Sequence, residues 1–103
     1  MKTNVTFRHT KGHHPELQAQ ALEYAEGFEK YFDGITSTNV EFMKETTGKE
    51  VKITTHVQGA TMVAEAEGID FATILHEASN KIVRQLKKHK TKLVDRKTKP
   101  IEI

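Results

Sequence analysis

The sequence predicts an α+β domain in which two helices pack on one face of a four-stranded mixed sheet. Three observations predict this fold. Apolar residues alternate with polar ones in four short segments, they recur every three or four residues in two longer segments, and turn signals separate these segments. A chain of 103 residues has the length of one domain with one hydrophobic core.

A strand followed by a helix is predicted for the first third of the chain. Residues 3–9 form the strand, because Val5 and Phe7 alternate there with polar residues. Pro15 suits the first position of a helix, which should end at the Asp-Gly pair of residues 33–34. The apolar stripe of this helix consists of Leu17, Ala21, Tyr24, Phe28 and Tyr31 or Phe32.

Three strands and a second helix are predicted for the remainder. The strands lie around Val40 and Phe42, over residues 51–57 and over residues 62–66, with turns at 47–49 and 58–59. Asp70 is a good N-cap for the second helix. Its inward-facing residues are Phe71, Ile74, Leu75, Ala78, Ile82, Leu86 and Leu93. The strand–helix–strand start allows the first two strands to pair in parallel.

The charges are distributed unevenly along the chain. Residues 1–80 contain seven Lys or Arg and twelve Asp or Glu, whereas residues 81–103 contain nine Lys or Arg and two Asp or Glu. The net charge of +2 is therefore the sum of −5 and +7. A block of like charge this dense repels itself unless a polyanion neutralises it.

The cations of the second helix are expected on the face opposite its apolar stripe. They are Lys81, Arg84, Lys87, Lys88 and Lys92, with Lys90 at the border. This pattern favours binding of a nucleic acid or another polyanion over a merely solvated face. No aromatic residue interrupts the cations in the sequence, so stacking of bases is not expected there and recognition of phosphates is.

The residues give little support to catalysis or to bound cofactors. The chain has no cysteine, no phosphate-binding glycine motif and no serine in the context of a nucleophile elbow. Its histidines lack nearby carboxylates that would complete a metal site. Glu65 and Glu67 are expected on the solvent side of a strand. We therefore predict no enzyme, no metal, no cofactor, no small-molecule substrate and no membrane partner.

Three segments of the chain resemble the ribosome hibernation promoting factor family, also called ribosome-associated inhibitor, protein Y or sigma-54 modulation protein. They are FEKYFD at 28–33, EAEGIDFATI at 65–74 and KIVRQLKKHKTK at 81–92, and the likeness extends in order over nearly the whole chain. The resemblance implies a strand–helix–three-strand–helix fold similar to a double-stranded-RNA-binding domain. It also implies a cytoplasmic protein that binds rRNA in the tRNA and mRNA channel of the small ribosomal subunit, and so silences translation under stress or in stationary phase.

The same resemblance implies which residues contact rRNA. Lys30 matches a basic position late in the first helix of the family. The positions that match its basic second helix are Lys81, Arg84, Lys87, Lys88, Lys90 and Lys92. Relatives often carry further cations where this chain has Glu23, Glu26 and Gly27. The chain looks like the short form, with one ribosome-binding domain over residues 1–99 and a tail over 100–103.

Two other functional classes stay open on the sequence. One is a double-stranded-RNA-binding protein unrelated to ribosomes. The other is a small acylphosphatase-like enzyme, with residues 100–103 as a short last strand. The predicted extra strand before the second helix argues against that enzyme fold.

Overall fold

A computed structural model of the protein describes residues 2–10, 12 and 14–98, with side chains described as far as Lys90. Its elements follow in the expected order β-α-β-β-β-α. Their bounds are β1 Lys2–Arg8, α1 Pro15–Phe28, β2 Ile35–Lys44, β3 Lys49–Val57, β4 Ala60–Gly68 and α2 Phe71–Thr98. The expectations for residues 100–103 and for the side chain of Leu93 fall outside the described residues.

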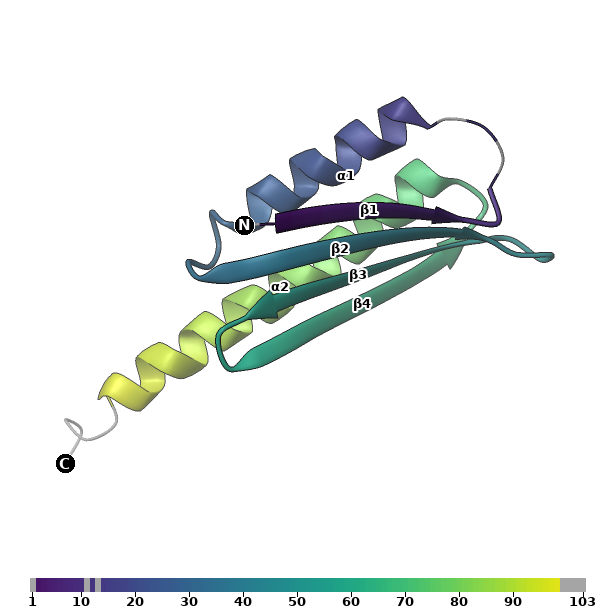
Figure 1. The fold of residues 1–103 in the computed structure, drawn as a ribbon. Helices are drawn as coiled ribbons and strands as arrows, with labels where there is room; N and C mark the ends of the chain where they lie inside the picture. The colour runs from purple at the N-terminus through teal and green to yellow at the C-terminus, as the bar shows by residue number, and fades with distance from the viewer. Residues whose placement is uncertain (1, 11, 13, 99–103) are drawn as a thin grey trace.

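The four strands form one sheet in the order β1-β2-β3-β4. β1 pairs with β2 in parallel, with Val5 opposite Val40, and the other two pairings are antiparallel. Both helices lie on one face of this sheet, and the C-terminal part of α2 extends beyond it (Figure 1). The predicted fold class and the parallel first pairing are thus confirmed.

The core lies between the sheet and the two helices. The alternating residues of the strands and the apolar stripes of the helices meet there, and Phe42, Leu75, Ile82 and Leu86 are fully buried. The ring of Phe42 stacks on that of Phe7 and meets that of Phe71 edge to face, at centroid distances of 4.8 and 5.3 Å. In the described part of the chain, neither helix is long and apolar enough to span a membrane.

The first helix is shorter than the sequence predicts. α1 ends at Phe28, and the next amides bond three residues back, as in the 3.1 Å bond from Lys30 N to Gly27 O. This tighter turn directs Tyr31 away from the apolar stripe, and the Tyr31 side chain is 37% exposed. Of the two residues expected to end the apolar stripe, Phe32 is half-buried against the core and Tyr31 is not.

Local geometry fixes where β4 ends and α2 begins. The backbone N–H of Thr73 donates to the Asp70 carboxylate over 3.1 Å, which confirms Asp70 as the N-cap. The same carboxylate accepts from the Thr73 hydroxyl, and these bonds hold the pKa of Asp70 below its usual value. A Cβ at Gly68 would lie 2.6 Å from Ile74 Cγ2, so only glycine lets α2 approach β4 this closely.

Candidate nucleic-acid interface

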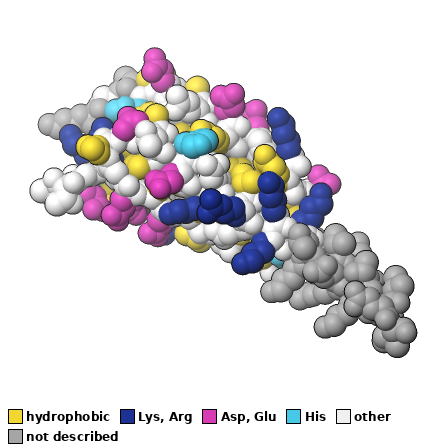
Figure 2. All heavy atoms as spheres, turned by 180° about the vertical axis from the view of Figure 1, so that it is seen from behind, with side chains coloured by type: hydrophobic (Ala, Val, Ile, Leu, Met, Phe, Trp, Pro, Cys, Tyr) yellow, Lys and Arg dark blue, Asp and Glu magenta, His cyan; other side chains and the backbone are white. Residues whose placement is uncertain are grey.

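A row of cations follows the outer face of α2. Its members, which we call the ridge, are Lys81, Arg84, Lys87, Lys88 and Lys90, and all five side chains are exposed. The opposite face of the helix is buried at Ala78, Ile82 and Leu86, so the packed core determines which way the ridge points. Figure 2 shows these cations gathered on the helical side of the molecule. The side chain of Lys92, the remaining expected member on α2, lies outside the described residues.

The ridge carries charge that the described part of the chain does not neutralise. Among the described residues the ion pair is Arg8–Glu41, and it lies on the sheet, away from the ridge. The side chains of Arg84 and Lys88 make no hydrogen bond or ion pair with any described residue. Like charges on successive turns of a helix repel one another. An external polyanion would remove this repulsion, and that makes the ridge the strongest candidate for a binding site.

Lys81 differs from the other members of the ridge because it also has a structural role. Its Nζ donates to the backbone oxygen of Glu65 over 2.8 Å, and the Gln85 amide donates to that of Val63 over 2.9 Å. Both acceptors lie on β4, at an edge of the sheet where backbone groups would otherwise face solvent. Side chains of α2 thus cover an edge that could pair with another chain.

An aromatic ring lies beside the cations, contrary to the expectation from the sequence. Lys87 Nζ is 5.2 Å from the centroid of the Tyr31 ring, which comes from the turn after α1. Lys30, the expected member from this region, is exposed in the same turn. No pattern in the sequence predicts this contact, because the two residues are far apart in the chain and the spacing within α2 cannot report it.

A network of polar side chains joins the two helices next to the ridge. The Tyr24 hydroxyl is 2.8 Å from His76 Nδ1, and Asn80 Nδ2 is 3.2 Å from His76 Nε2. A groove of about 600 Å³ lies between α1 and α2 at this place. Its walls include Tyr24, Tyr31, Lys30 and Asn80, so it is continuous with the cationic surface.

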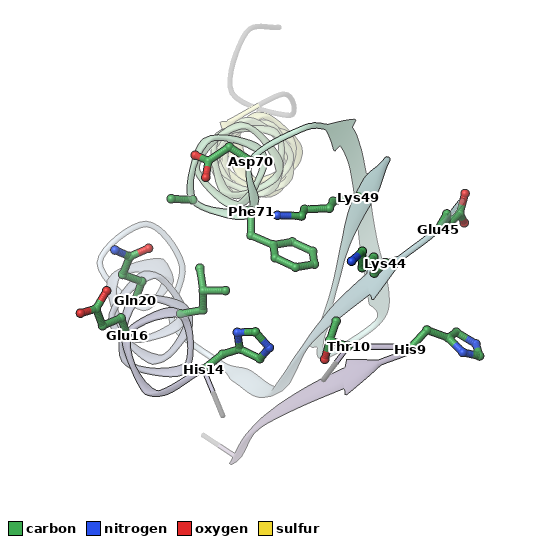
Figure 3. A pocket seen from close by; sticks show the side chains of 12 residues that line it. His9, Thr10, His14, Glu16, Gln20, Lys44, Glu45, Lys49, Asp70 and Phe71 are labelled. Carbon is green, nitrogen blue, oxygen red and sulfur yellow. The ribbon is translucent and has the colours of Figure 1, made fainter. Parts of the chain in front are cut away.

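A second cavity, of about 740 Å³, lies at the other end of the helices, where α1 and α2 begin. In Figure 3 the His14, Lys49 and Phe71 side chains point into it, whereas His9 and Glu45 point away. Lys49 Nζ lies 4.9 Å from the centroid of the Phe71 ring. His9 and His14 therefore do not converge, and the described side chains contain no group of three potential ligands that could hold a metal ion.

The carboxylates of the sheet lie on its open face, the face away from the helices. Glu65 and Glu67 are exposed there, as predicted, and β4 pairs them with Lys52 and Glu50 of β3. Burial and the neighbouring carboxylates, chiefly Glu45 and then Glu65, raise the pKa of Glu50. This arrangement places negative charge on the side of the molecule opposite the ridge.

Comparison with known proteins identifies the family of the chain. The family model described as "Sigma 54 modulation protein / S30EA ribosomal protein" matches residues 3–94. A ribosome hibernation promoting factor of Azotobacter vinelandii is 34% identical over 100 residues, covering 93% of this chain and 89% of the relative. One of Escherichia coli is 32% identical over 97 residues, covering 90% of this chain and 97% of the relative.

Solved structures show the same fold at lower identity. A ribosomal subunit interface protein from Coxiella burnetii has a TM-score of 0.76 and 20% identity, covering 86% of this chain and 98% of that one. The N-terminal domain of Thermus thermophilus Protein Y has a TM-score of 0.77 and 15% identity, covering 86% and 99%. These structures show the fold, whereas the family model over residues 3–94 and the relatives at 32–34% identity show that the chain belongs to the sigma 54 modulation protein / S30EA ribosomal protein family.

Proposed function

We propose that this protein is a ribosome hibernation factor that binds the small ribosomal subunit through the ridge and occupies the channel of tRNA and mRNA. The observation that carries the proposal is the set of exposed cations without counter-charge, Arg84 and Lys88 above all, in a member of this family. Ribosomal RNA is the polyanion that a family of ribosome hibernation factors meets. Translation would stop under stress or in stationary phase while the protein stays bound.

The mechanism is occupation of space and requires no reaction. Ile82 and Leu86 are fully buried, so the ridge stands on a helix that the core holds in place. Cations held in this way lose little conformational freedom of the backbone when they meet phosphates. The family is not one of enzymes, and the arrangement of the described residues is suited to binding.

The affinity should come largely from release of the counterions of RNA. If about five to seven phosphates are neutralised, the slope of log affinity against log salt should be about −4 to −6. Pelleting of the protein with purified small subunits over a series from about 50 to 200 mM salt measures this slope. A slope near zero would contradict the proposal.

Competition experiments test the location in the channel. Prior loading of the small subunit with mRNA and tRNA should prevent binding of the protein. Undiminished binding to loaded subunits would show that the protein lies elsewhere on the ribosome. Equal affinity for an unrelated double-stranded RNA would instead favour the general RNA-binding protein that the sequence left open.

A further inference from the structure

The groove between α1 and α2 has features that the ridge lacks. With about 600 Å³ it falls in the range of about 300–1,000 Å³ that small-molecule sites occupy. It opens beside the ridge, and Figure 2 shows apolar side chains next to the cations on this face. The residues that matter for its chemistry are Glu23, Tyr24, Gly27, Tyr31, Ser79 and Asn80.

The walls of the groove suit an aromatic, polar and uncharged group. Tyr24 and Tyr31 supply aromatic surface, and the His76 contact of 2.8 Å holds the Tyr24 hydroxyl in position. The Asn80 amide can donate and accept hydrogen bonds. The Glu23 carboxylate disfavours a phosphate inside the groove, yet it can accept from an exocyclic amino group. A nucleobase has this combination of a flat π-system with donors and acceptors on its edge.

The floor of the groove has an unused hydrogen-bonding group and unused space. Ser79 is 1% exposed and lines the groove, and its hydroxyl has no hydrogen-bond partner among the described residues. Buried polar groups usually have a partner, so this hydroxyl is an exception that a bound polar edge could satisfy. A Cβ built on Gly27 meets no heavy atom within 4 Å, so glycine leaves the α1 wall open.

We propose that the groove receives an unpaired nucleobase of the RNA whose phosphates lie along the ridge. This inference rests on the proposed function, because Lys87 connects the two surfaces: it belongs to the ridge and its Nζ lies 5.2 Å from the Tyr31 ring centroid. Lys30 lies at the groove on the α1 side. An RNA backbone that passes between these two cations can turn one base inward, onto the tyrosines. The preferred RNA element is then single-stranded at this point.

A pair of oligoribonucleotides of equal length and charge tests the proposal. One is oligoadenylate and the other is the same sugar–phosphate chain without bases. We expect the native protein to bind oligoadenylate at least about fivefold more tightly, the lower end for a base stacked on an aromatic ring. Gly27→Leu, which places a side chain in the groove, should abolish this preference and leave the affinity for the abasic chain unchanged.

Two further variants make the test specific. Ala19→Leu adds the same side chain at an exposed position of α1 outside the groove, and it should keep the preference for oligoadenylate. Tyr31→Ala removes the exposed ring and should abolish the preference, which provides a second test if Gly27→Leu folds poorly. Equal binding of both oligomers by the native protein, or a preference that survives both groove variants, overturns the proposal.

Binding to the small subunit separates this proposal from the proposed function. If the native protein shows no base preference but pellets with small subunits in a salt-dependent way, only the proposal of a nucleobase site is contradicted. If the protein prefers oligoadenylate but does not pellet with small subunits, the groove is supported as a nucleobase site and the proposed ribosomal function is contradicted.

Discussion

The ridge and the open face of the sheet differ in how their charges are balanced. On the open face, Arg8 forms a 2.6 Å ion pair with Glu41, and Lys52 lies opposite Glu65. The ridge has no such internal partners among the described residues. The sheet therefore neutralises part of its own charge, whereas α2 depends on an external anion. The carboxylates of α1, which include Glu23 and Glu26, share the helical side with the ridge, so a polyanion should follow α2 and avoid α1.

Removal of two ridge cations should have the largest effect. Arg84→Ala/Lys88→Ala is expected to weaken binding to the small subunit by about 100-fold or more, because each hydrogen bond to a charged group contributes about 1.5–3 kcal/mol. Both side chains are exposed and alanine favours a helix, so the melting temperature should not fall. Pelleting and thermal unfolding measure the two results.

A matched variant on the other surface removes the same charge. Lys2→Ala/Lys52→Ala changes two exposed cations of the open face and should leave binding within about threefold, since charges beyond about 10 Å are largely screened at 0.1 M salt. Equal losses in the two double variants would show that only net charge matters. That outcome would contradict the division of the molecule into a binding and a non-binding side.

The sequence predicts the direction of the ridge but not its surroundings. Periodicity places Ile82 and Leu86 inward and Arg84 and Lys88 outward, because the helix repeats every 3.6 residues and the core covers only one side. The contact of Lys87 with Tyr31 depends on how two helices pack and on where α1 ends. No pattern within either helix contains that information, so the groove and its aromatic wall became visible only in the structure.

The edge of β4 marks the boundary between the two surfaces, and its protection can be tested. Gln85→Ala removes the 2.9 Å bond to the Val63 carbonyl, whose loss should cost about 1 kcal/mol. For a domain of this size that corresponds to a decrease of about 4–8 °C in melting temperature. Gln18→Ala, which truncates an exposed glutamine of α1, should change it by less. An equal decrease in both variants would show that the bond to β4 contributes nothing beyond the general effect of truncation.

The smallest effect concerns the carboxylates of the open face. Burial and the neighbouring carboxylates raise the pKa of Glu50 above its ordinary value of 4.5, so the ionised group destabilises the folded state. This penalty is absent when the pH lies below the ordinary value and is complete once the pH has risen through the raised pKa. Glu50→Gln should therefore increase the melting temperature slightly at neutral pH.

The difference between Glu50→Gln and the native protein should disappear in acid, where both side chains are neutral. Thermal unfolding over a pH series measures it, with Glu29→Gln at the end of α1 as the matched variant. A lower melting temperature of Glu50→Gln at neutral pH would mean that attraction to Arg8 and Lys52 outweighs the repulsion of Glu50 by the neighbouring carboxylates. The open face would then be held together by its charges, and the ridge alone would carry unbalanced charge.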